Sequence, residues 1–146
     1  MSTVYPSGIS AAPARVEVDV RDDGIAIVAL HGEHDLSDSP LLADALRTAG
    51  CGSRVLVDLS ECTYLDLSVV GRLITLRNRL AAGGGRLELF IAPEATVMWP
   101  IARRTGLAAC LRTHTSLSEG IASLSAPAAP VTEAVPTKRR LRITRR

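Results

Sequence analysis

One short apolar stretch constrains the fold of this chain more than any other feature. The segment RVLVDLS, at 54–60, is apolar at almost every position, which is typical of a β-strand covered on both faces or lying at the centre of a sheet. A helical pattern follows from about Ser68 to Ala82 and ends at three glycines. A buried strand that leads directly into a helix predicts a sheet with helices packed against it.

The segments on either side extend this alternation of strand and helix. Alternating apolar residues at 15–20, an Asp-Gly turn and a second apolar run at 25–32 predict a β-hairpin. Further strands are predicted at 86–92 and 109–115, and further helices within 37–52, 95–107 and 116–124. Strands separated by helices pair in parallel through crossovers. We therefore expect an α/β fold: a mixed sheet of four or five strands with an antiparallel first hairpin, flanked by about four helices.

Small polar residues predict where these helices begin. Ser39 is expected to cap the first helix, with Pro40 at its first position and Gly50 at its end. Thr96 is the candidate cap of the third helix, and Ser116 or Ser118 that of the last.

The length of 146 residues predicts a single domain with tails. We expect a flexible N-terminal tail at 1–14, a folded domain at 15–124, and a Pro/Ala linker with a basic tail at 125–146. No run approaches the roughly 18 apolar residues of a membrane span, and the N-terminus lacks a signal-peptide pattern, which predicts a cytoplasmic protein. The basic tail is expected to be solvated, with contact to an anionic partner as the alternative; its charges are Lys138, Arg139, Arg140, Arg142, Arg145 and Arg146.

The cysteines and histidines do not form a metal or nucleophile motif. Cys51, Cys62 and Cys110 are too scattered for a disulfide framework or a CxxC site, so buried free thiols are expected. On a strand, His31 and His34 would point to opposite faces, and no metal or cofactor is predicted. A phosphatase-like enzyme with Cys62 as nucleophile would need phosphate-cradling glycines and an arginine, which the adjoining sequence lacks.

The stretch TYLDLSVVGRL, at 63–73, places an acid and a hydroxyl where the central strand leads into the helix. Ser68 is expected to cap this helix, with a phosphoacceptor or a direct partner contact as alternatives, because a helix N-terminus favours an anion. Asp66 is a candidate cap of the same helix. Asp35 ends the second strand, and since the second and third strands should be neighbours, we expect Asp35 and Asp66 at one edge of the sheet.

This order of elements, together with four motifs, resembles the STAS domain of bacterial anti-sigma factor antagonists. The segment LHGEHDLSDSPLL is similar to the family's G-E-L-D block, and RVLVDLSECTYLDLSVVGRL to its strand-loop-helix block. RLAAGGGRLELFIAP is similar to its A-x-x-x-G-G-x-L-x-L segment, and RRTGLAACLRTHTSLSEGIASL to its closing block. The resemblance covers roughly residues 15–124.

The resemblance implies a non-enzymatic regulator that docks onto a histidine-kinase-like anti-sigma factor and so releases a sigma factor for transcription. In the family, the serine directly after the aspartate is phosphorylated by that kinase, which ends binding. Here Leu67 occupies this position, so the switch is predicted to be lost or moved to Ser68. The residues to which the resemblance assigns partner binding are Asp35, Asp66, Leu67, Ser68 and Gly71.

Two other functions stay open at this point. A STAS subunit of a lipid-transport or stress-signalling assembly would act by docking alone, which suits Leu67. The other is the phosphatase-like enzyme built on Cys62. The sequence does not choose between a monomer and a homodimer.

Overall fold

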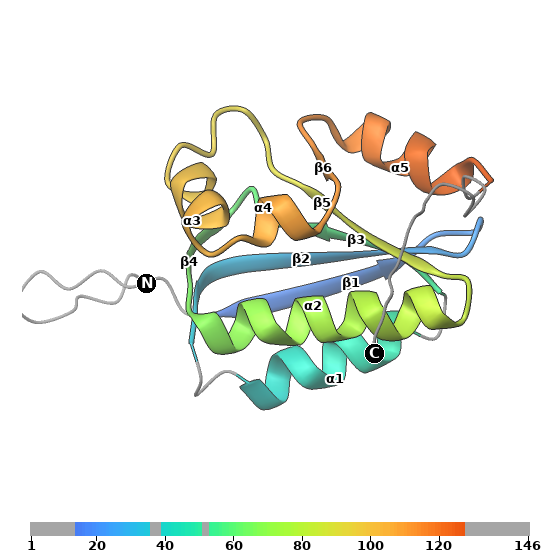
Figure 1. Ribbon diagram of the computed structural model, residues 1–146, viewed down its shortest axis with the longest axis horizontal. Helices are drawn as coiled ribbons and strands as arrows, with labels where there is room; N and C mark the ends of the chain where they lie inside the picture. Colours follow the sequence, from blue (N-terminus) through green and yellow to red (C-terminus); the bar gives the residue numbers. More distant parts are fainter. Residues whose placement is uncertain (1–13, 36–38, 51–52, 128–146) are drawn as a thin grey trace, which may run out of the picture.

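The structure is a computed structural model that describes residues 14–35, 39–50 and 53–127 (Figure 1). Its strands are β1 (Arg15–Val20), β2 (Ile25–His34), β3 (Arg54–Asp58), β4 (Cys62–Leu65), β5 (Arg86–Phe90) and β6 (Thr113–His114). Its helices are α1 (Ser39–Gly50), α2 (Leu67–Ala82), α3 (Met98–Arg104), α4 (Leu107–Cys110) and α5 (Leu117–Ser125).

The sheet is mixed, with β3 at its centre. The strand order is β1-β2-β3-β5-β6, and β4 pairs with β2 beside this path. The β1–β2 hairpin is antiparallel, with Val18 opposite Val28, and β3 and β5 continue the sheet in parallel. The predicted mixed α/β fold with an antiparallel first hairpin is therefore confirmed.

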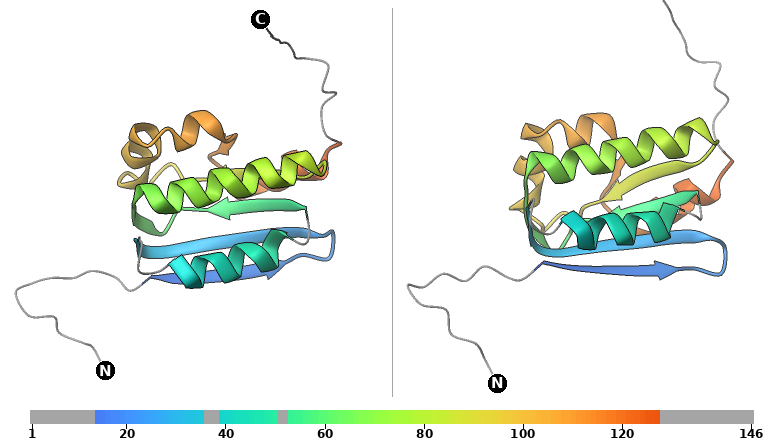
Figure 2. Two further views of the ribbon diagram at one scale, coloured as in Figure 1. Left: turned by 60° about the horizontal axis from the view of Figure 1, so that its bottom comes forward. Right: turned by 90° about the horizontal axis from the view of Figure 1, so that it is seen from below.

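Helices cover both faces of this sheet. In Figure 2, α1 and α2 lie side by side along one face, while Figure 1 shows α5 on the other. Side chains along β3 point alternately to the two faces of the sheet. Val55 and Val57 belong to the large core, and Leu56 packs on the other face with Ile25 of β2 and Leu124 of α5. The apolar run at 54–60 thus belongs to a strand buried on both faces, as predicted.

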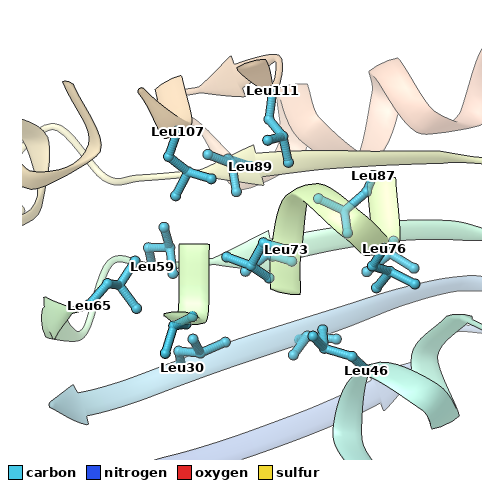
Figure 3. Close-up of a cluster of buried hydrophobic side chains, with 14 of the residues drawn as sticks. Leu30, Leu46, Leu59, Leu65, Leu73, Leu76, Leu87, Leu89, Leu107 and Leu111 are labelled. Carbon is cyan, nitrogen blue, oxygen red and sulfur yellow. The ribbon is translucent and has the colours of Figure 1, made fainter. Parts of the chain in front are cut away.

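The large core consists mainly of aliphatic side chains, as the scarcity of aromatic residues requires. Figure 3 shows that the leucines of this core come from different elements. Leu73 of α2 lies near the middle of the view, with Leu107 of α4 above it. Leu42, Leu46 and Ala49 of α1 are buried in it, whereas Leu41 of the same helix is exposed. This core fixes α1 and α2 against the sheet and so sets the position of both helix N-termini.

Several short elements differ from the predictions. β4 and α4 were not predicted, and the expected strand at 109–115 shrinks to the two residues of β6 because Ala109 and Cys110 belong to α4. The prediction that Thr96 caps the third helix is wrong: α3 follows Val97, and no side chain caps it. Ser116 does cap α5, and its hydroxyl accepts a hydrogen bond from the Glu119 N–H.

The ends of the remaining helices agree with the sequence to within a residue. α1 begins at Ser39, the residue predicted to cap it, and ends at Gly50, the glycine predicted at its end. α2 ends at Ala82 with Gly83 as its C-cap, and Gly84 follows with a φ of +85° that favours glycine. Residues 1–13 of the tail predicted at 1–14, the basic charges from Lys138 onward and Cys51 lie outside the described residues. No helix among the described residues is long and apolar enough to cross a membrane.

Candidate partner-binding site at the carboxyl edge of the sheet

Strand β4 carries the chain to the site. After β3 ends, a turn over 59–61 brings β4 alongside the last residues of β2, where Gly32 N–H donates to Glu61 O at 3.1 Å. Leu65 then pairs with His34, and the N–H of Asp66 donates to His34 O at 3.2 Å. Since Asp35 directly follows His34, the structure places Asp35 and Asp66 at the same edge of the sheet, as predicted.

Asp66 is the cap of α2. One carboxylate oxygen, Oδ1, accepts hydrogen bonds from the N–H of Ser68 at 3.0 Å, the N–H of Val69 at 3.2 Å and the Ser68 hydroxyl at 2.6 Å. Asp66 has the extended backbone of a cap residue, with φ −90° and ψ 174°. The prediction that Ser68 caps the helix is wrong, because Ser68 is already the second helical residue.

The residue that follows the cap is exposed to solvent at the N-terminus of α2. Leu67, the first residue of α2, is 71% exposed and is the most exposed large apolar residue among those described. Tyr64 of β4 is 44% exposed, while Ser68 is only half-buried with its hydroxyl directed to Asp66. We call Asp35, Tyr64, Asp66 and Leu67 the carboxyl-edge surface.

Two residues complete the account of the predicted site. Tyr64 was not predicted as part of it; the β-forming pattern of CTYL was the available signal. Gly71 lies away from this surface, one turn further into α2, where it lines a groove between α1 and α2. The structure therefore brings together Asp35, Asp66, Leu67 and Ser68, but sets Gly71 apart.

The cysteine chemistry considered from the sequence finds no support in the structure. Cys62 is buried in the large core, and this burial raises the pKa of its thiol to about 11, although a hydrogen bond with the backbone of Tyr64 opposes the shift. A thiol protonated at neutral pH is a poor nucleophile. Cys110 is exposed, so the expectation that all three thiols are buried is wrong for this residue.

The histidines have structural roles that the sequence did not predict. His34 is fully buried, and its Nε2 lies 3.0 Å from His31 O. The Nε2 of His114 lies 2.7 Å from Oε1 of the buried Glu88. Within the described residues, no three His, Cys, Asp or Glu side chains gather in a way that would hold a metal ion.

Comparison with known protein families identifies the class to which this chain belongs. The family model described as "Mlab, STAS domain" matches residues 11–113, and the chain belongs to this STAS family. The resemblance to the STAS domain drawn from the four motifs is thereby confirmed. Comparison with curated proteins gives no match.

Solved structures share the fold at low sequence identity. The anti-sigma factor antagonist from Mycobacterium paratuberculosis is 17% identical, with a TM-score of 0.61 over 80% of this chain and 100% of that chain. The anti-sigma factor antagonist SpoIIAA in its unphosphorylated form is 17% identical, with a TM-score of 0.61 over 76% and 96%. The phosphorylated form of SpoIIAA, described as a Bacillus cell fate determinant, is 19% identical, with a TM-score of 0.56 over 75% and 98%.

Proposed function

We propose that this protein is a non-enzymatic anti-sigma factor antagonist of the cytoplasm. It docks through the carboxyl-edge surface onto a histidine-kinase-like anti-sigma factor and so releases a sigma factor for transcription. Membership of the STAS family and the likeness to anti-sigma factor antagonists support this role. The juxtaposition of Asp35 and Asp66 beside an exposed leucine supports the choice of surface.

The observation that carries the proposal is the exposure of Leu67. A leucine that is 71% exposed at the first position of a helix contributes little to the fold, but it offers an apolar anchor to a partner. It occupies the position at which the family carries its phosphoacceptor, and it has no hydroxyl. Docking here is therefore not ended by phosphorylation at this position.

The geometry around Ser68 favours loss of the phospho-switch over its displacement by one residue. The Ser68 hydroxyl donates a hydrogen bond to Asp66 Oδ1 at 2.6 Å. A phosphoryl group on the Ser68 oxygen would remove the proton that is donated. It would also place about −1.5 to −2 charges beside a carboxylate, which is repulsive. We infer that this protein binds its partner constitutively.

A second candidate function is supported by the same leucine. A STAS subunit of a lipid-transport or stress-signalling assembly acts by docking alone and needs no phosphoacceptor. The two candidates share a docking surface and differ in the partner that occupies it.

The test identifies the partner and its dependence on Leu67. Tagged protein is recovered from its native host as wild type, as Leu67→Glu and as Leu117→Glu, and co-purifying proteins and phosphopeptides are identified by mass spectrometry. Leu117 is a matched control, because it is the first residue of α5, is 40% exposed and lies on the opposite face of the sheet. Glutamate in the first turn suits a helix, so both variants should fold.

We expect a kinase-like anti-sigma factor with wild type and Leu117→Glu, and its loss with Leu67→Glu. Recovery of transporter subunits instead would replace the antagonist role with the second candidate. A partner bound equally by Leu67→Glu would show that the carboxyl-edge surface is not the docking site. Stoichiometric phosphate on Ser68 that dissociates the complex would refute constitutive binding.

A further inference from the structure

A groove between α1 and α2 begins next to the carboxyl-edge surface and extends away from it along α2. It has a volume of about 780 Å³ and runs along α2 from Ser68 to Leu80. Leu46, Leu76 and Leu80, whose side chains are largely buried, contribute its apolar lining. The two helices lie side by side in both views of Figure 2, so the groove is a surface channel between parallel walls.

The α2 wall of this groove is strongly cationic. The 16 residues of α2 include Arg72, Arg77 and Arg79 but no aspartate or glutamate. On the opposite wall, the charge of Arg47 is balanced by Asp44, whose Oδ1 lies 2.8 Å from Arg47 Nη2. Arg72 and Arg79 both line the groove and are exposed, and no described residue forms an ion pair with either. Two guanidinium groups thus face solvent along one side of an apolar channel.

Gly71 supplies an independent observation from the middle of the same wall. It is exposed, lies inside α2, and a Cβ built on it would meet no atom within 4 Å. Glycine destabilises a helix interior relative to alanine by roughly 0.5–1 kcal/mol, so a packing reason is expected for its presence. The described part of the chain provides none. A closely approaching second molecule would.

The charge and the shape of the groove favour an extended acidic partner. Arg72 and Arg79 are seven residues apart, which corresponds to about 10.5 Å along a helix and places both on one face of α2, so their charges form a row along the groove. A second helix with carboxylates seven positions apart repeats the same spacing, and apolar residues between them would cover the leucines of the groove. A helix of a second copy of this chain is unsuitable, since no helix in the described residues carries more than one acid.

We propose that the α1–α2 groove, with Arg72 and Arg79 on its rim and Gly71 in its wall, binds an acidic amphipathic helix of a partner protein. Guanidinium groups pair with carboxylates through two parallel hydrogen bonds. The absence of a side chain at Gly71 allows the backbones of the two helices to come close together. This proposal is independent of docking at the carboxyl-edge surface, because it requires none of the residues of that surface.

The test uses a synthetic peptide and the whole protein. The probe is a fluorescein-labelled, end-capped helix of about 18 residues, long enough to be partly helical alone, with glutamates seven positions apart flanking leucines. The control peptide replaces those glutamates with lysine. Binding is measured by fluorescence anisotropy for wild type, Arg72→Glu, Arg79→Glu and Gly71→Leu. Arg104→Glu is the matched protein control, since Arg104 is an exposed arginine of α3 outside the groove.

We expect saturable binding of the acidic peptide, with a dissociation constant below about 100 μM at low salt. Reversing either groove charge or adding the Gly71→Leu side chain should weaken it at least about tenfold, and Arg104→Glu should change it less than about twofold. Thermal unfolding of each variant shows that it is folded. No saturable binding, or equal binding to Arg72→Glu and Arg104→Glu, would overturn the proposal.

Amide chemical shifts locate the bound peptide. They should change most at Gly71 and Thr75, in the wall of the groove. Changes centred on Tyr64 and Leu67 would assign the peptide to the carboxyl-edge surface and would reject the groove.

Discussion

At the scale of single residues, Asp66 has the most consequences, because one oxygen accepts three hydrogen bonds at the start of α2. We expect Asp66→Ala to lower the free energy of unfolding by about 1–2 kcal/mol, the usual cost of removing a cap. Ser68→Ala removes only the hydroxyl donor and should cost less than about 1 kcal/mol. Urea denaturation measures both values. An equal or larger loss in Ser68→Ala would contradict the assignment of Asp66 as the cap.

The buried thiol of Cys62 predicts a dependence of stability on alkaline pH. Burial raises the pKa of Cys62 from an ordinary 9.0 to about 11, so the folded state favours the neutral thiol. The resulting stabilisation is complete below pH 9 and is lost as the pH rises through 11, by about 2–3 kcal/mol in all. Denaturation at pH 8 and pH 11 should show this loss in wild type and in Cys110→Ala. An unchanged loss in Cys62→Ala would refute the prediction.

The sequence allowed part of the site to be predicted at this scale. The expected pairing of the second and third strands placed Asp35 and Asp66 at one edge, although β4, which was not predicted, makes the direct contact with the end of β2. Aspartate and serine are both good caps, so the residue types do not decide between Asp66 and Ser68. The cap is the residue with the extended backbone, which is Asp66. Leu65, at the end of β4, pairs with His34, and α2 begins at Leu67, one residue earlier than predicted.

At the scale of elements, the glycines of α2 and α5 differ in their surroundings. Gly71 in α2 has open space where a side chain would lie, whereas Gly120 in α5 packs against Leu56. We expect Gly71→Ala to raise the free energy of unfolding by about 0.5–1 kcal/mol, because the added methyl group meets open space. Gly120→Ala should lower it, since its Cβ would lie 3.0 Å from both Leu56 methyl carbons. Thermal unfolding of the two variants should therefore shift in opposite directions. A lower melting temperature for Gly71→Ala would contradict the open space seen around it.

The C-terminal end of α5 is held by arginines of the sheet. Arg86 donates to Ser123 O at 3.0 Å, Leu124 O at 2.9 Å and Ala126 O at 2.6 Å, while Arg54 also donates to Leu124 O. A lysine has no planar fork to satisfy these carbonyl groups together. Arg86→Lys should therefore speed amide exchange in the last turn of α5, with little change in α1. Arg104→Lys is the control, and equal protection in both variants would disprove this role.

Element length explains which elements were predicted. β2, β3, α1 and α2 are long enough for apolar periodicity to identify them. β4, α4 and β6 have four residues or fewer, so no period is repeated within them. β2 is longer than β3, so the backbone groups of the last residues of β2 need another strand to pair with, and β4 provides it. This requirement cannot be read from the sequence of β4 alone.

At the scale of the whole molecule, the two-sided sheet joins a large core and a small one. The central strand belongs to both, with Val55 in the large core and Leu56 in the small one. The sequence predicted strands and helices in order but left open whether helices cover one face or both. That choice depends on contacts such as the packing of Leu124 against Leu56, between residues far apart in the chain.

Sharing a central strand predicts that the two cores unfold together. We expect Leu124→Ala, on the buried face of α5, to lower the free energy of unfolding by about 2–4 kcal/mol. Trp99 is the only tryptophan, and it packs against the large core. If the cores are coupled, its fluorescence and the far-UV circular dichroism should give the same urea midpoint in wild type and in Leu124→Ala, although the two proteins differ in midpoint. A Trp99 transition that Leu124→Ala leaves in place, with an earlier loss of helical signal, would mean that α5 unfolds as a separate unit.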